Sequence, residues 1–75
     1  MDFDYSRLKG RIVEKYGSQV EFAKHLGTSE KTVSDKINGK KGWRQDEIYK
    51  MINLLEIPSS SIEEFFFRTK LKKFN

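Results

Sequence analysis

The chain has 75 residues, of which 36% are hydrophobic and 35% are charged. This length accommodates one small domain, and the longest apolar run, Phe65-Phe66-Phe67, is far shorter than the roughly 18 residues that cross a bilayer. The absence of cysteine excludes disulfides, thiolate metal sites and cysteine nucleophiles. The N-terminal residues lack the basic and apolar segments of a secretory signal, so we expect neither secretion nor membrane insertion.

The formal net charge of +4 is distributed in blocks along the chain. It amounts to +1 over residues 1–18, +3 over 19–44, −4 over 45–67 and +4 over 68–75. A polyanion would therefore approach the first half of the chain and its basic tail, and would avoid residues 45–67.

Apolar spacing and capping residues predict five helices and no strand, which defines an all-α fold. The first helix spans about residues 5–16, and either Asp4 or Ser6 can cap its N-terminus. The second begins after Ser18, whose hydroxyl can cap it, and ends at Gly27, because glycine readily adopts the positive φ of a helix C-terminus.

Three further helices follow in the second half of the chain. Thr28 or Ser29 caps the third helix, which ends at Asn38-Gly39. The fourth spans about residues 45–55, and a short fifth helix, capped by one of three serines, spans about 59–67.

These elements indicate a single domain over residues 1–67, followed by a basic tail over 68–75. A basic loop over residues 40–44 joins the third and fourth helices.

The most informative pattern lies in residues 19–39. Two short helices can cross steeply only where a small residue lies at the crossing and a glycine or similar residue forms the turn. Ala23 and Gly27 meet these demands, and Val33 and Ile37 would hold the second helix of the pair against the first. The remaining side chains of that helix would then face outward, where they could enter a DNA major groove: Glu30, Lys31, Thr32, Ser34, Asp35 and Lys36.

This pattern resembles the helix-turn-helix of lambda-type phage repressors and Cro proteins. The matching residues are Gln19, Ala23, Gly27, Ser29 to Val33, Ile37 and Asn38-Gly39. The chain is also similar to small Cro-like regulators of temperate phages of Gram-positive hosts, at Asp4 to Gly10, Trp43 to Ile48, Leu54 to Pro58 and Glu64 to Phe67. The resemblance covers nearly the whole chain and implies a five-helix, lambda-repressor-like helix-turn-helix domain.

The resemblance also implies two sets of contact residues. It places base-reading side chains at Glu30, Lys31, Thr32, Ser34 and Asp35. It places contacts to the sugar–phosphate backbone at Gln19, Ser29, Asn38, Lys40, Lys41 and Arg44. A lysine can read guanine and basic loops neutralise phosphates, whereas carboxylates can accept a hydrogen bond from cytosine but are repelled by phosphates.

Two functions are consistent with this interpretation. The main hypothesis is a transcriptional regulator of the phage lysis–lysogeny switch that binds a double-stranded DNA operator, as a homodimer with recognition helices ~34 Å apart. The alternative is an anti-repressor, in which acidic residues such as Glu30 and Asp35 pair with the basic DNA-reading helix of a phage repressor and block it. Either protein would act in the bacterial cytoplasm and would need no cofactor or metal. An antitoxin is compatible with the same fold, but no residue favours it.

An enzyme is not expected. The adjacent carboxylates in Asp46-Glu47 and Glu63-Glu64 would point about 100° apart on a helix and could not share a substrate. No glycine-rich phosphate loop or metal-ligand spacing occurs, and the one histidine, His25, is expected on an exposed flank of the second helix.

The aromatic residues leave alternatives open. Trp43 either packs over the end of the third helix or stacks against a sugar or a partner protein. Phe65 and Phe66, spaced with Ile62, are expected to face the core, whereas Phe67 falls off that stripe. Phe67 is then either a partly exposed edge of a self-contained core or, with Phe74 in the tail, part of an apolar patch that meets another chain.

Overall fold

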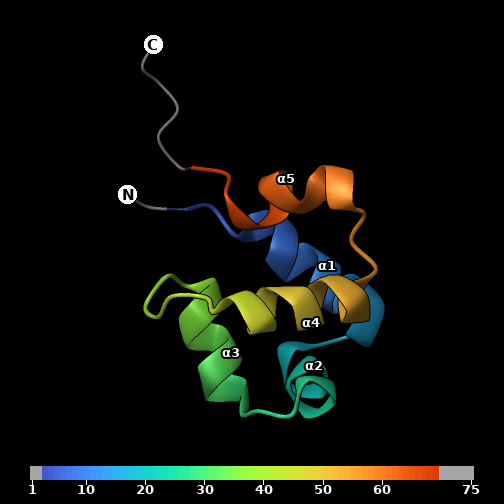
Figure 1. The fold of residues 1–75 in the computed structure, drawn as a ribbon. Coiled ribbons are helices and arrows are strands. Elements are labelled where there is room, and N and C mark those ends of the chain that lie inside the picture. Colours follow the sequence, from blue (N-terminus) through green and yellow to red (C-terminus); the bar gives the residue numbers. More distant parts are fainter. Residues whose placement is uncertain (1–2, 70–75) are drawn as a thin grey trace.

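The computed structural model describes residues 3–69, which form five α-helices and one short 3-10 helix (Figure 1). Their bounds are α1 (Ser6–Tyr16), α2 (Gln19–Leu26), α3 (Glu30–Ile37), α4 (Gln45–Leu55), η1 (Ser59–Ser61) and α5 (Ile62–Phe66). The prediction of an all-α, five-helix fold is confirmed. Over residues 3–69, no helix combines the length and apolar character needed to span a membrane.

Serine hydroxyls determine where α2 and α3 begin. Ser18 Oγ accepts a hydrogen bond from the Glu21 amide at 3.1 Å, and Ser29 Oγ accepts one from the Thr32 amide at 3.2 Å. Each bond satisfies an amide that has no partner within its own helix. Of the two candidate caps for α3, the cap is therefore Ser29 and not Thr28.

The start of α1 differs from both of its predicted caps. Tyr5 occupies the N-cap position and makes no capping hydrogen bond through its side chain. Asp4 instead acts from one position earlier, since its Oδ1 accepts a hydrogen bond from the Ser6 amide at 2.9 Å.

The two ends of the described chain lie side by side (Figure 1). Phe3 and Thr69 form an isolated antiparallel bridge, and the Asp4 amide donates to the Arg68 carbonyl at 2.6 Å. The absence of any strand pattern gave no indication of this pairing. The rest of the predicted basic tail, residues 70–75, lies outside the described residues.

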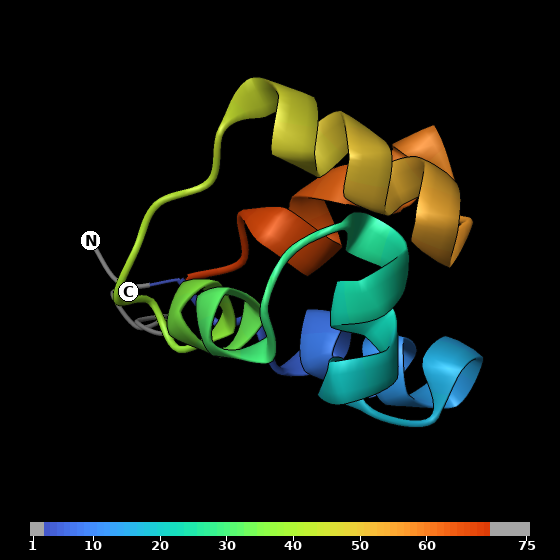
Figure 2. The same ribbon diagram turned by 90° about the horizontal axis from the view of Figure 1, so that it is seen from below.

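The core draws side chains from all five helices, and Phe22 and Phe66 are the largest that are fully buried. α2 packs against α1, α3 and α4, while α1 also packs against α5. Figure 2 shows the resulting arrangement, with the loop between α3 and α4 running along one side of the molecule. Phe65 and Phe66 are buried as predicted.

Candidate functional site

α2 and α3 pack against each other across a tight turn. Gly27 forms the turn with a left-handed φ of +85°, and the amides of Gly27 and Thr28 both donate to the Ala23 carbonyl, at 2.9 and 3.0 Å. Ala23 itself is buried, as a small residue at a helix crossing must be. The predicted turn residue and the predicted small residue are therefore both confirmed.

α3 is held to the body by three buried side chains, not two. Val33 and Ile37 are buried as predicted. Lys36, which we expected to point outward, is only 8% exposed. Its ammonium forms an ion pair with Glu47 of α4 and lies 5.6 Å from the centroid of the Trp43 ring. The helical spacing contained this signal, because a residue three positions after Val33 lies on the same side of the helix as Val33.

Glu47 connects α3 to the start of α4. Its Oε1 accepts a hydrogen bond from the Arg44 amide at 2.9 Å, while its other carboxylate oxygen pairs with Lys36. Partial burial raises the pKa of Glu47, but the hydrogen bonds and the charges of Lys36 and Arg44 outweigh burial, so this pKa lies below its ordinary value. Glu47 is thus ionised at neutral pH and holds Lys36 away from the outward face of α3.

The side chains predicted to read bases differ in exposure. Glu30 and Lys31 at the start of α3 are exposed, whereas Thr32, Ser34 and Asp35 are partly covered. The Asp35 side chain is only 14% exposed and pairs with Lys31 at 3.3 Å. Among residues 3–69, the Glu30 carboxylate has no ion-pair partner.

Three residues predicted to contact phosphate lie at helix ends, and two of these are already engaged. Ser29 Oγ accepts a hydrogen bond from the Thr32 amide, and Asn38 Nδ2 donates a hydrogen bond to Ser34 Oγ at 3.2 Å. Gln19, at the first position of α2, is partly buried.

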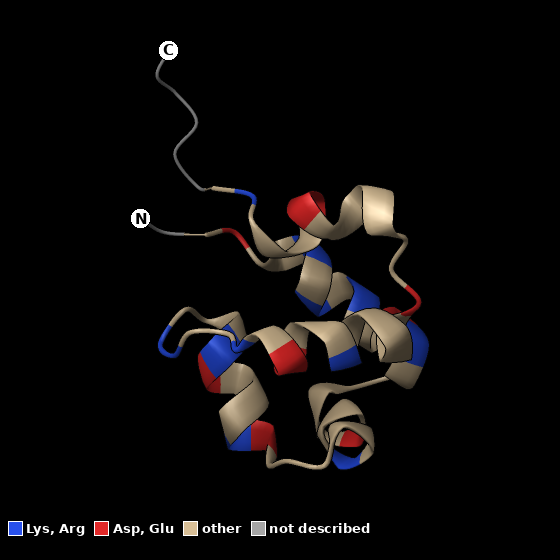
Figure 3. Cartoon of the chain, viewed as in Figure 1, with Lys and Arg blue, Asp and Glu red and all other residues tan. Residues whose placement is uncertain are grey.

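The other three lie in the basic loop between α3 and α4, which Figure 3 colours blue at its Lys and Arg positions. Lys40 and Lys41 are exposed, and neither has an ion-pair partner in the described part of the chain. Arg44 is also exposed and lies 3.5 Å from Asp46, measured from Nε to Oδ1. These three predicted phosphate-contacting cations thus lie in the one segment that joins α3 to α4.

Two further predicted residues have packing roles. Trp43 packs edge-on against Tyr5 and Phe66, with ring centroids 6.0 and 5.7 Å apart, which favours the core alternative. Burial raises the pKa of the Tyr5 hydroxyl, and the neighbouring Trp43 side chain partly offsets this rise.

His25 is exposed, as predicted, with its ring 4.8 Å from that of Tyr16. Across residues 3–69, no group of three or more potential ligands could hold a metal ion.

These features define a small all-α domain in which α3 presents a mixed polar face beside a basic loop. The chain belongs to the family described as "Protein of unknown function (DUF739)", whose model matches residues 1–69. No curated protein matches the chain significantly.

The structure is similar to the solution structure of the modulator of repression (MOR) of the temperate bacteriophage TP901-1 from Lactococcus lactis. The two chains are 48% identical, with a TM-score of 0.77, and the match covers 89% of this chain and 90% of that one. This similarity agrees with the phage-regulator part of the sequence interpretation. The base-reading and phosphate-contacting roles of individual residues stay predictions.

Proposed function

We propose that this protein modulates repression by binding a phage repressor and blocking the repressor's DNA-reading surface. This is the anti-repressor alternative of the sequence analysis. It is supported by the 48% identity to a phage modulator of repression and by the charge that α3 presents to solvent. The observation that carries it is the inward position of Lys36, whose charge is neutralised by Glu47.

Removing Lys36 from the surface changes the balance of charge on α3. The helix contains two carboxylates and two ammonium groups, but Lys36 is neutralised by Glu47 of α4, whereas Asp35, whose side chain is only 14% exposed, pairs with Lys31 within α3. One more carboxylate than ammonium is then left, and Glu30 is both exposed and unpaired among residues 3–69. The main hypothesis assigns DNA reading to this face of α3, and the face is therefore slightly acidic.

A slightly acidic face is better suited to a protein than to a phosphate backbone. Repressors that bind DNA carry basic side chains where they face the duplex, because phosphate neutralisation supplies much of their affinity. Complementary charges across an interface favour association and disfavour partners of like charge. Glu30, with Lys31 and Thr32 beside it, would meet such a basic surface and cover the residues that the repressor uses on DNA.

The experiment mixes this protein with the repressor of the same phage and its operator DNA. We expect the wild-type protein to co-elute with the repressor in size-exclusion chromatography and to release it from the operator in a gel shift. Glu30→Lys should weaken the complex about tenfold or more, which corresponds to about 1.4 kcal/mol, because it places a cation against a basic surface. Glu63→Lys is the matched control, since Glu63 is exposed on α5 and also unpaired in the described chain.

Circular dichroism melting of both variants separates binding from folding. Glu30 lies in the first turn of α3, so its reversal costs up to about 1 kcal/mol of helix stability through the helix dipole. An unchanged repressor elution volume and operator affinity in the presence of the wild-type protein would refute the proposal. If Glu30→Lys and Glu63→Lys bound the repressor equally well, α3 would not be part of the interface.

Direct binding to operator DNA is the second candidate, and the exposed, unpaired Lys40 and Lys41 favour it. A gel shift without repressor tests it in the same series. Lys40→Ala should weaken binding to all sequences alike, whereas Lys31→Ala should relax the preference for the operator. Equal, weak binding of the wild-type protein to operator and scrambled DNA at physiological salt would exclude this candidate.

A further inference from the structure

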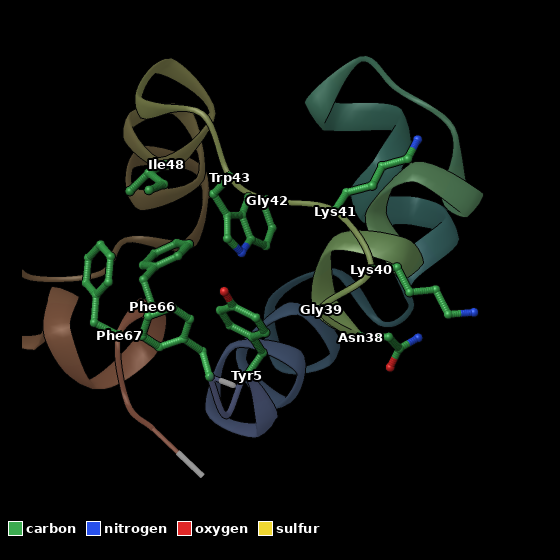
Figure 4. Close-up of a pocket in the computed structure, with 11 residues that line it drawn as sticks. Tyr5, Asn38, Gly39, Lys40, Lys41, Gly42, Trp43, Ile48, Phe66 and Phe67 are labelled. Atoms are coloured by element: carbon green, nitrogen blue, oxygen red, sulfur yellow. The ribbon is translucent and has the colours of Figure 1, made fainter. Parts of the chain in front are cut away.

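A groove of about 580 Å³ lies between the α3–α4 loop, the N-terminal segment and α5 (Figure 4). Its apolar side contains Tyr5, Trp43 and Phe66, of which Tyr5 and Phe66 each pack edge-on against Trp43. Phe67 forms a further part of this side and is 48% exposed. An exposed aromatic ring beside an aromatic groove is the usual composition of a site that receives an apolar side chain.

The opposite rim of the groove is basic. It consists of the loop from Asn38 to Gly42, which contributes Lys40 and Lys41. No acidic residue lines the groove among residues 3–69. The two lysine side chains extend outward from this rim (Figure 4), so they would meet the parts of a ligand that leave the groove. Their charges are available for this contact because no carboxylate of the described chain pairs with them.

The Trp43 ring of the groove already has three neighbours and is therefore poorly suited to stacking on a nucleobase. Tyr5 and Phe66 meet Trp43 at interplanar angles of 72° and 90°, and Lys36 Nζ lies 5.6 Å from the Trp43 ring centroid. Single-stranded nucleic acids bind through open ring faces, on which successive bases stack. An aliphatic or aromatic side chain inserted between ring edges does not need such a platform.

We propose that this groove binds an acidic peptide segment of a partner protein, with a bulky apolar side chain in the aromatic side and flanking carboxylates on Lys40 and Lys41. The site is separate from the face of α3 on which the proposed function rests. Peptide binding in the groove and repressor binding on α3 can therefore succeed or fail independently.

The test uses the full-length protein and an acetylated, amidated peptide in which a Leu-Phe pair is flanked by aspartate and glutamate. Trp43 is the single tryptophan of the chain and lines the groove, so its fluorescence reports binding directly. We expect a saturable change that weakens as salt rises from about 50 to 500 mM, because exposed charges are screened. A peptide with lysine in place of each acid should bind at least tenfold more weakly.

Matched variants locate the site. Lys40→Glu combined with Lys41→Glu should weaken the acidic peptide at least tenfold, whereas Lys9→Glu, at an exposed lysine outside the groove, should not. Phe67→Ala should weaken it severalfold, in contrast to Tyr49→Ala, which removes an aromatic ring that is 70% exposed elsewhere. Thermal melting by circular dichroism confirms that each variant is folded.

Three results would overturn the inference. These are equal binding of acidic and basic peptides, unchanged binding by the groove variants, and tighter binding of an oligothymidylate that competes with the peptide. The last result would assign the groove to nucleic acid. Glu30→Lys should leave peptide binding unchanged, so a failure of the repressor experiment does not decide this one.

Discussion

Lys31 and Lys36 lie on the same helix but have opposite surroundings. The Lys36 side chain is 10% exposed and contacts Glu47 and Trp43, whereas the Lys31 side chain is 83% exposed and pairs with Asp35 one turn away. Breaking a buried ion pair leaves an uncompensated charge, while exposed pairs contribute little to stability. Of the two lysines of α3, Lys36 is therefore the one expected to contribute to the stability of the fold.

Lys36→Ala is expected to lower the free energy of unfolding by about 1–3 kcal/mol, because it leaves Glu47 without its ammonium partner and removes packing beside Trp43. Lys31→Ala should change it by less than about 0.5 kcal/mol. Urea denaturation followed by circular dichroism measures both values. Equal losses in the two variants would contradict the role of Lys36 in holding α3 to the body of the protein.

The same ion pair predicts a pH dependence. Because the pKa of Glu47 is lowered in the folded state, its contribution to stability is present above the ordinary glutamate pKa and is lost as pH falls through the lower folded value. Wild-type stability should thus fall more steeply than that of Glu47→Gln between about pH 5 and pH 3. The pKa of Glu56 is also lowered, by its hydrogen bond to Lys15 and by the charge of Lys15. Because Glu56 is present in both proteins, its contribution cancels in the comparison of their stability curves. Parallel stability curves would show that Glu47 has no such role.

At the scale of the elements, the glycine that forms the turn after α2 has a different role from the glycine inside α1. Gly27 has a φ of +85°, whereas Gly10 lies inside α1, and an added Cβ there would meet nothing within 4 Å. Gly27→Ala should lower stability by about 1–2 kcal/mol, because a side chain is strained in the left-handed region. Gly10→Ala should raise it by about 0.5–1 kcal/mol, since alanine favours a helix interior. Thermal unfolding measures both, and shifts of the same sign would refute this account of the turn.

At the scale of the whole molecule, one small core holds all five helices. Phe22 of α2 is fully buried, and α2 packs against α1, α3 and α4. A substitution of Phe22 is therefore expected to disturb the packing of α2 against all three of these helices. Phe67, in contrast, is 48% exposed.

Phe22→Ala is expected to cost about 3–5 kcal/mol, a large part of the roughly 5–15 kcal/mol that stabilises a typical domain. The variant should lose its helical signal in one cooperative transition far below the wild-type melting temperature. Phe67→Ala should melt within a few degrees of the wild type, since its ring is half exposed. A normal melting temperature for Phe22→Ala would mean that α2 is not the centre of the core.

Much of the fold follows from signals that act within a few residues. Ser18 and Ser29 cap the helices that begin beside them, and Gly27 ends α2 where a positive φ is needed. The apolar spacing predicted that Phe65 and Phe66 face the core, and both are buried.

Contacts between distant segments were not predictable in the same way. The pairing of Phe3 with Thr69 joins residues from opposite ends of the chain, and the groove combines that N-terminal segment with α5 and the loop after α3. Lys36 was expected at the surface with the other α3 residues that follow Glu30, apart from Val33 and Ile37, and the partner that its buried charge needs, Glu47, comes from another helix.

The sequence by itself determined the helices, the serine caps of α2 and α3 and the turn between these two helices, because capping, helical periodicity and glycine conformation are local properties of the chain. The tertiary structure decided which charges face solvent. A charged side chain becomes buried only where packing supplies a partner of opposite charge, and here that partner left α3 with an outward face that is slightly acidic.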